Sequence, residues 1–317
     1  MIADFIFSAN IVLPFVLVVI LGAYLKRKRI LTDAFFVGGN NLIFNIAIPS
    51  TLFYSVYTED ISELFDPAFA GFVIGWLILS AVVIWIVSYI FMRKKYSHLI
   101  SAFVQACFRG NIIIVGLPLL VRILGSEASV GSFAIALMTP FYSVIAVIVL
   151  TVHNGDGRKL SASEVFWGVV KNPPFIGVMI GLIFSALHIP VPVIILRTIS
   201  TLGGLTTPLA LLCLGGGIKF TGFTSKFKVA LLASIIKVVF LPIGAVSLAY
   251  LLGFSNTHLT VIMILNAVPS AFAAYVMAIK LGGDEYVAGN SIFFGLVLCA
   301  FTLTIFIMLF RTFNIIA

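Results

Sequence analysis

The chain has 317 residues, of which 62% are hydrophobic and 9% are charged, with a formal net charge of +8 and a mean hydropathy of +1.22. Because a soluble domain needs roughly a quarter of its residues charged, this composition excludes a water-soluble fold and indicates a surface that faces lipid. The positive excess does not indicate nucleic-acid binding, since its position along the chain follows membrane topology. The three cysteines, Cys107, Cys213 and Cys299, lie in apolar runs and predict neither a disulfide framework nor a metal cluster.

Ten mostly apolar runs, separated by charged residues, Gly, Asn and Pro, predict ten membrane-spanning helices of about 20 residues or more. In chain order they cover residues 5–25, 34–57, 67–92, 98–121, 128–152, 165–188, 191–218, 228–253, 257–280 and 287–313. The positive cluster at 26–29 follows the first run instead of preceding it, which favours a retained helix over a cleaved signal peptide. The predicted fold class is an all-helical integral membrane protein.

The charges of the connections alternate, and this pattern predicts the orientation of the chain because Lys and Arg stay on the cytoplasmic side. The odd-numbered connections hold Lys26, Arg27, Lys28, Arg29, Arg93, Lys94, Lys95, Arg158, Lys159, Lys171, Lys219, Lys226, Lys228 and Lys280. The even-numbered connections and the C-terminus hold Arg122, Arg197 and Arg311, and the second connection is acidic, with Glu59, Asp60, Glu63 and Asp66. We therefore expect a multi-pass protein of the inner or plasma membrane with both termini outside the cytoplasm.

The longest polar stretch, a predicted cytoplasmic linker at 153–164, divides the chain into residues 1–152 and 165–317, each with five predicted spans. Because five is odd, two copies of such a unit must have opposite orientations. Prolines recur at matching places, in the second helix of each half (Pro49, Pro208) and in the fourth (Pro118, Pro269). Inverted repeats with broken helices are typical of secondary transporters. The alternative is that these prolines only kink their helices.

The segments around these prolines resemble the auxin efflux carrier family, which includes plant auxin exporters and bacterial carriers named malate or malonate permeases. The fourth run contains Arg109-Gly-Asn111-Ile-Ile-Ile-Val-Gly-Leu-Pro118, which is similar to the family's fourth-helix motif. Further matches in chain order are 45–53, 171–173, 207–211, 268–271 and 278–283. The short connection between the fifth and sixth runs resembles the compact prokaryotic form of the family.

The resemblance implies a scaffold made of helices 1, 2, 6 and 7 and a moving transport domain made of helices 3 to 5 and 8 to 10. It also implies that helices 4 and 9 unwind and cross at their prolines, Pro118 and Pro269, and that the protein forms a homodimer through the scaffold.

Ionisable residues are almost absent from the predicted membrane interior, because every acidic residue falls in a connection or at the end of a run. Arg109 and Lys237 lie inside runs, where an ionised side chain is costly unless it faces protein or water. Without an acid at their depth, their natural counter-ion is an anion from outside. Alternatively, Arg109 caps carbonyls near Pro118 or reaches the interface. For Lys237 we favour a structural role, in which its side chain reaches the cytoplasmic side.

Amides and hydroxyls near the prolines are the remaining candidates for binding. Asn111 can pair with unwound backbone, a substrate carboxylate or a hydrated ion, and a binding role is favoured by the family motif. Asn266 and Ser270 flank Pro269 and are equally compatible with a structural role. Weaker candidates, which can serve packing alone, are Gln105, Asn45, Thr206 and Thr207. The residues that we expect at the site are Asn111, Arg109, Pro118, Asn266, Pro269, Ser270 and Asn45.

These features predict a secondary transporter of small organic anions, such as malate, malonate or auxin-like acids, with elevator-type movement driven by membrane potential. The expected partners are the anion, the bilayer and a second copy of the chain, with no nucleic acid, cofactor or metal. The four histidines lie near ends of runs, and the Gly203-Gly204 and 215–217 glycines favour close helix approach over phosphate binding. An enzyme is not expected, since no nucleophile–base pair is evident. The alternative function is an anion channel or a ligand-sensing membrane protein.

Overall fold

The computed structural model describes residues 2–58, 66–153, 163, 166, 167, 170, 171, 173–217 and 225–315. Throughout these residues the chain is helical and forms no β-strand, only one isolated bridge. The prediction of an all-helical fold is confirmed. Most of the predicted linker 153–164, together with Glu59, Asp60 and Glu63, lies outside the described residues.

Helical segments occupy all ten of the predicted runs. The first half contains α1 (Ile2–Arg27), α2 (Asp33–Leu42), η1 (Ile43–Ala47), α3 (Ile48–Tyr57), α4 (Pro67–Met92), η2 (Ser97–Leu99), α5 (Ile100–Phe108), η3 (Ile112–Gly116), α6 (Leu117–Leu124), η4 (Gly125–Glu127) and α7 (Ala128–Val152). The second half contains α9 (Pro173–Ala186), α10 (Val193–Gly204), α11 (Thr206–Gly217), α12 (Ser225–Ile235), η5 (Ile236–Phe240), α13 (Leu241–Leu251), α14 (Asn256–Ala267), α15 (Phe272–Lys280) and α16 (Glu285–Thr312).

Five helical stretches of the described chain are long and apolar enough to cross a membrane. They are Pro67–Met92, Leu119–Val152, Val193–Gly217, Lys226–Leu251 and Glu285–Thr312. The structure therefore supports a membrane protein with several apolar helices. The full count of ten spans and the inverted repeat stay predictions, because the other runs hold shorter helices, interrupted helices or side chains that are not described.

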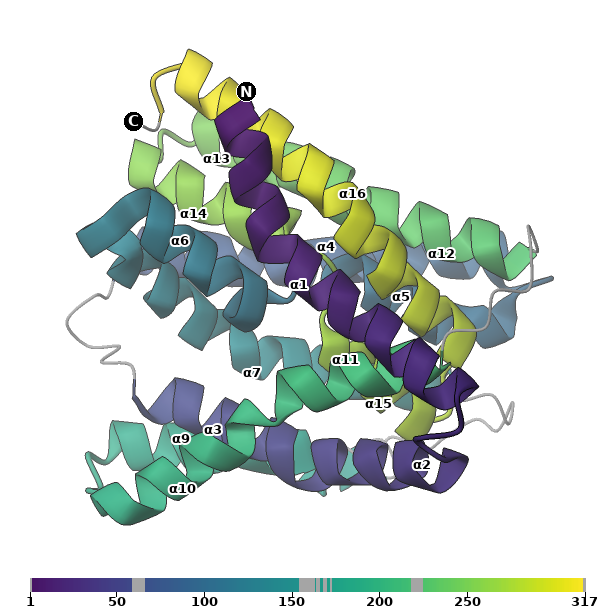
Figure 1. Ribbon diagram of the computed structural model, residues 1–317. Coiled ribbons are helices and arrows are strands. Elements are labelled where there is room, and N and C mark those ends of the chain that lie inside the picture. The colour runs from purple at the N-terminus through teal and green to yellow at the C-terminus, as the bar shows by residue number, and fades with distance from the viewer. Residues whose placement is uncertain are drawn as a thin grey trace.

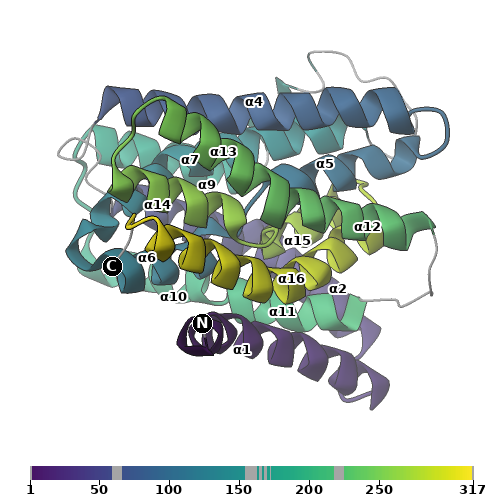
Figure 2. The same cartoon turned by 90° about the horizontal axis from the view of Figure 1, so that it is seen from above.

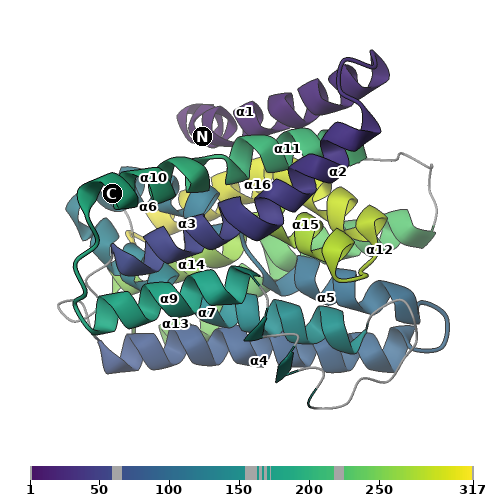
Figure 3. The ribbon, with the colours of Figure 1, turned by 90° about the horizontal axis from the view of Figure 1, so that it is seen from below.

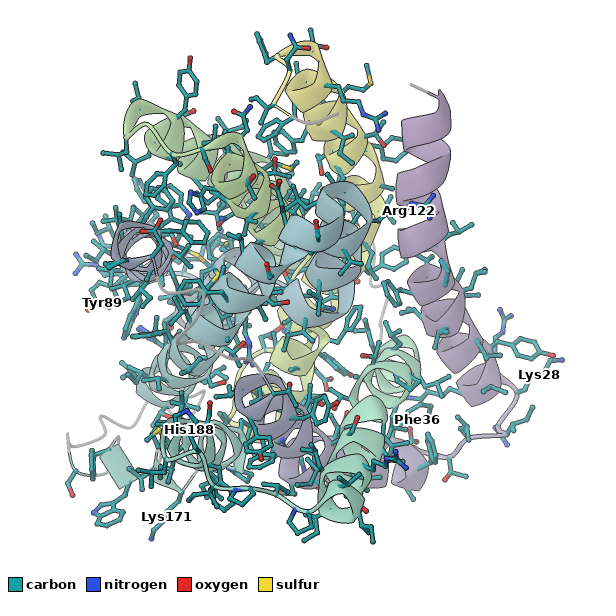
Figure 4. All side chains as sticks on the ribbon, turned by 90° about the vertical axis from the view of Figure 1, so that its left-hand side faces the viewer. Lys28, Phe36, Tyr89, Arg122, Lys171 and His188 are labelled. Atoms are coloured by element: carbon teal, nitrogen blue, oxygen red, sulfur yellow. The ribbon has the colours of Figure 1, made fainter. Side chains whose placement is uncertain are left out.

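The helices form a bundle (Figure 1), and seen from above α1 and α4 lie on opposite edges of it with α14, α15 and α16 between them (Figure 2). Helix α1 packs on α11 and α16, α3 packs on α9 and α10, and α4 packs on α5 and α7. Both termini lie toward one end of the bundle, and the α1–α2 and α4–α5 connections lie at the other end (Figure 3). Lys28 after α1 and Tyr89 on α4 point away from the bundle on opposite sides (Figure 4).

Wider helical turns precede three of the prolines. These π-turns cover Ile43–Ala47, Ile112–Gly116 and Ile236–Phe240, and each is followed two residues later by Pro49, Pro118 or Pro242. A proline has no N–H, and its ring crowds the carbonyl four residues earlier. A π-turn, in which the N–H group bonds to the carbonyl five residues earlier, relieves this conflict without ending the helix. The helix around Pro118 is therefore continuous.

Glycines allow the close approach of helices that the sequence predicts. A Cβ at Gly215 would overlap with the carbonyl of Val19 on α1, and a Cβ at Gly22 would overlap with the carbonyl of Leu212 on α11. The two helices thus meet backbone to backbone, as small residues permit in membrane proteins. Gly204 is different, because nothing lies within 4 Å of its Cβ position.

Candidate functional site

Two helices of the bundle are interrupted, and the interruptions face each other. Helix α5 ends at Phe108, and Arg109 then takes extended backbone angles (φ −83°, ψ 104°). Helix α14 ends at Ala267, and Val268 is likewise extended (φ −65°, ψ 150°). The helical course resumes at Ile112 in the first case and at Phe272 in the second.

The two extended segments are joined by a pair of backbone hydrogen bonds. The Asn111 N–H donates to the carbonyl of Pro269 (2.8 Å), and the Ala271 N–H donates to the carbonyl of Arg109 (3.0 Å). These bonds form an antiparallel bridge between Gly110 and Ser270. The broken backbone is thereby satisfied internally, as a low-dielectric environment requires.

The position of this crossing corrects one expectation from the family resemblance. Pro269 lies at the break in its helix, but Pro118 does not, because the break on that side is centred on Gly110. The reason is that the π-turn Ile112–Gly116 accommodates the proline inside the resumed helix. The absence of a side chain at Gly110 instead permits the close approach of the two segments, because a Cβ there would lie 3.0 Å from Val268 Cγ2.

The ends of the four half-helices at the crossing fall into two sets with opposite partial charge. The first N–H groups of the half-helices that begin at Ile112 and Phe272 have no acceptor within the helix, and no side chain caps them. These ends therefore carry partial positive charge. The half-helices that end at Phe108 and Ala267 present carbonyls with partial negative charge. An anion is favoured on the first side and a cation on the second.

A cavity of about 70 Å³ lies on the anion-favouring side of the crossing. Its lining comes from both interrupted helices and from α3, α7 and α11, and comprises Ile48, Thr51, Leu52, Arg109, Gly110, Asn111, Ile112, Ile113, Thr139, Tyr142, Thr206, Ala271, Phe272 and Ala273. A second cavity of about 210 Å³ shares Thr51, Ile113 and Thr206 with it. The site is small, and its polar groups converge from segments far apart in the sequence.

Arg109 and Asn111 are the polar residues of the crossing that line this cavity. Both side chains are 4% exposed. The Arg109 guanidinium donates through Nη1 to the sulfur of Met277 (2.7 Å), and the Asn111 amide nitrogen has no hydrogen-bond partner among the described residues. A buried amide donor without a partner is costly, which makes it a natural contact for an acceptor on a ligand.

Three hydroxyl residues of the lining were not singled out in the sequence. The Thr51 hydroxyl lies 2.8 Å from that of Thr206 and donates to the carbonyl of Gly203 (2.9 Å). Tyr142 lines the cavity together with Gly110, and Thr139 lies one turn before Tyr142 on α7. In the sequence these three residues could have been found by their distance from a proline. Thr139 and Tyr142 flank Pro140 and Thr51 follows Pro49, all within three positions.

The other expected site residues are not part of the cavity lining. The side-chain oxygen of Asn266 accepts from Trp76 Nε1 (3.1 Å), and its nitrogen donates to the Ile262 carbonyl (2.9 Å). The Ser270 hydroxyl donates to the carbonyl of Ala106. Asn45 is exposed and donates to the carbonyl of Asn41 (2.9 Å). These contacts give each side chain a structural partner.

Charged groups are distributed as the sequence indicates, with one exception. The acidic residues whose backbone is described lie at helix ends or caps: Asp4, Asp33, Asp66, Glu127, Asp284 and Glu285. Lys237, which we expected to reach the cytoplasmic side, is 0% exposed and lies inside the bundle on η5. It does not reach the interface, because α5, α14 and α16 pack against η5, which continues α12 into α13. The described residues contain no cluster of metal ligands.

Comparison with known proteins gives a match over almost the whole chain. A family described as membrane transport protein matches residues 7–307. An uncharacterized transporter of Methanothermobacter thermautotrophicus is 25% identical over 93% of this chain and 95% of its own length. The uncharacterized transporter MJ1031 of Methanocaldococcus jannaschii is 24% identical over 90% and 92%. The uncharacterized transporter YfdV of Escherichia coli K12 is 20% identical over 84% and 86%.

Proposed function

Because the chain belongs to the membrane transport protein family, we propose that it is a secondary transporter of small organic anions and that its substrate binds in the cavity at the crossing. The family match agrees with the resemblance to auxin efflux carriers. It is a family of membrane transporters and not of enzymes. The substrate class, the movement and the driving force are the parts of this assignment that we propose.

The observation that carries the proposal is the convergence of donors on one small cavity. Two uncapped half-helix N-termini border it, together with Arg109 and with Asn111, whose amide nitrogen has no partner among the described residues. None of the cavity-lining residues is acidic. Such a site favours a carboxylate, which accepts hydrogen bonds through two oxygens and neutralises buried positive charge.

The organisation of the helices supports an inverted repeat and an elevator-type movement. The interruption at Gly110 has its counterpart at Ser270, and the wide turn before Pro49 has its counterpart in the turn at Leu205 between α10 and α11, before Pro208. Helix α3 packs on α9 and α10 and α1 packs on α11, whereas α12 packs on α16 and α13 packs on α14. We propose that the first group is the scaffold and that the crossing moves with the second.

The cavity lies where these two groups meet. Thr51 and Thr206 come from the proposed scaffold, and Arg109, Asn111 and Ala271 come from the proposed moving part. Sliding of the moving part past the two threonines would carry the anion from one side of the membrane to the other. The same proposal includes three further features. Residues 1–152 and 165–317 are the two repeats, both termini lie outside the cytoplasm, and two copies of the chain form a homodimer through the scaffold.

The test is uptake of labelled organic acids into proteoliposomes by the wild type, Asn111→Ala and Asn290→Ala. Asn290 is a matched control, because it is a buried asparagine on α16 that is absent from the cavity lining and donates to the Tyr286 carbonyl (2.9 Å). We expect Asn111→Ala to abolish saturable uptake and ligand-induced thermal stabilisation while remaining monodisperse. Asn290→Ala should retain both.

Two results would contradict this proposal. If monodisperse Asn111→Ala is stabilised by the acids as the wild type is, the cavity is not the binding site. If flux does not saturate and shows no counter-transport, the protein is a channel, and binding without any flux would indicate a sensor.

A further inference from the structure

Lys237 is a buried amine that the site described above leaves without a role. Its side chain is 0% exposed, and its nitrogen has no hydrogen-bond partner among the described residues. The nitrogen lies 2.9 Å from the Cβ position of Gly110, which itself lines the cavity. The amine therefore packs against a residue that lines the place where we put the anion.

The surroundings of Lys237 contain thiols and carbonyls in place of carboxylates. The nearest titratable groups are the buried thiols of Cys107 on α5 and Cys299 on α16. The other described ionisable residues of the helices that pack on η5 or continue it lie at helix ends: Lys226 and Lys228 on α12, Tyr250 on α13, His258 on α14, and Glu285, Tyr286 and Arg311 on α16. Arg109 follows α5 and adds a second positive charge.

One partial negative charge is close. The carbonyl of Leu265 lies 3.1 Å from the same Cβ position of Gly110 and cannot receive the usual helical hydrogen bond, because residue 269 is a proline. A half-helix end of this kind favours a cation, but by much less than the loss of hydration disfavours an unpaired buried ammonium. In the empty carrier the balance favours the neutral amine.

An anion in the cavity reverses that balance. It would be the missing counter-charge, next to the glycine that the amine packs against and in a medium of low dielectric constant where charges interact strongly. We propose that Lys237 exchanges a proton with each transport cycle, as a neutral amine when the cavity is empty and an ammonium when an organic anion occupies it. The step takes one proton from solution onto the amine nitrogen, and no other bond changes.

This inference rests on the proposed function and assigns its charge stoichiometry. A monovalent anion that moves with one proton crosses without net charge. A divalent anion still carries one negative charge and stays driven by the membrane potential. There is a pH range in which Lys237 is neutral in the empty carrier and protonated in the loaded one. Because binding takes up one proton in this range, the affinity for the anion should fall roughly tenfold for each unit by which the pH rises.

The first experiment needs no ligand and measures the charge of Lys237 in the empty protein. Thermal unfolding of the purified wild type and of Lys237→Met is followed between mildly acidic and alkaline pH. A neutral Lys237 binds its proton only on unfolding, so wild-type stability should rise with pH relative to Lys237→Met, with up to about a tenfold change in the unfolding constant per pH unit. Equal pH dependence in the two proteins would overturn the inference. Lys237→Gln serves the same purpose if Lys237→Met does not fold.

The second experiment uses malonate as the probe, at a slightly alkaline pH where both of its carboxylates are ionised. Calorimetric titrations in phosphate and in Tris, whose ionisation enthalpies differ, count the protons taken up on binding. We expect about one proton per malonate for the wild type and none for Lys237→Met or Lys237→Arg, because methionine cannot bind a proton and arginine does not release one. Saturable heats that are independent of buffer would overturn the inference and leave the proposed function intact. If the wild type gives no malonate heat, the proposed function is contradicted, and the unfolding comparison still decides the charge of Lys237.

Discussion

A methyl group added at Gly110 tests the packing of the crossing. In Gly110→Ala the new Cβ would lie 2.9 Å from Lys237 Nζ, 3.0 Å from Val268 Cγ2 and 3.1 Å from the carbonyl of Leu265. All three distances are shorter than ordinary van der Waals contact, and one neighbour is backbone. Overpacking of this kind costs about 1–3 kcal/mol, and the stiffer unfolded chain returns about 0.4–1 kcal/mol. We expect a net loss of about 1–2 kcal/mol, which is roughly a 5- to 30-fold change in the unfolding constant.

The assay is thermal unfolding of purified protein in detergent together with uptake into proteoliposomes. Gly71→Ala is the matched control, because Gly71 lies on α4 with nothing within 4 Å of its Cβ position and should gain about 0.5–1 kcal/mol from the alanine. Lys237→Met ends one atom short of the amine, so it should recover part of the loss in the double variant. If Gly110→Ala is as stable as Gly71→Ala and transports normally, the packing at the crossing is refuted.

Three further outcomes are expected. Pro269→Ala and Pro118→Ala should lower uptake more than they lower stability. Each alanine restores a backbone N–H, so regular helix can form where the backbone is now interrupted (Pro269) or widened into a π-turn (Pro118). Normal uptake by both variants would remove these prolines from the mechanism. Burial lowers the pKa of His153, and the neutral ring accepts a hydrogen bond through Nε2 from Trp85 Nε1 (2.7 Å). The stability of the wild type relative to His153→Ala should therefore be fully present above about pH 6.5, the pKa of an unfolded histidine. It should decrease as the pH falls through the lower pKa of the folded protein. A constant difference across that range contradicts this assignment. A potassium-diffusion potential, with sodium and proton gradients set to zero, should drive a divalent anion, since each net charge contributes about 2.3 kcal/mol per 100 mV; flux that ignores voltage contradicts the proposed driving force.

The sequence by itself determined the fold class and the helical segments. Long apolar runs have one stable backbone conformation in lipid, because every N–H and carbonyl must be paired within the segment. Charges and prolines between and within the runs mark their limits, and the helices begin and end within a few residues of those limits except where residues are not described. Close helix approach at Gly215 was also readable from the sequence, and the structure shows that α1 is the helix that approaches it.

The candidate site was only partly readable. Arg109 and Asn111 stood out because polar residues are rare inside apolar runs, and both line the cavity. Asn266 has the same sequence signal, yet its amide is occupied by Trp76 and the Ile262 carbonyl. Periodicity places a side chain on a helix but does not name its partner, so the two asparagines could not be told apart.

Only the tertiary structure decided where the helices open and what Lys237 faces. The break could be at Pro118 or at Gly110 on local grounds, because proline and glycine both weaken a helix. It lies at Gly110, since the bridge to Ser270 needs two backbones in contact and a π-turn accommodates the proline. Lys237 could have reached water along a lone helix, but α5, α14 and α16 pack against its helix and place its amine against Gly110. Which charges meet is a property of the packed bundle, because the residues concerned lie more than a hundred positions apart in the chain.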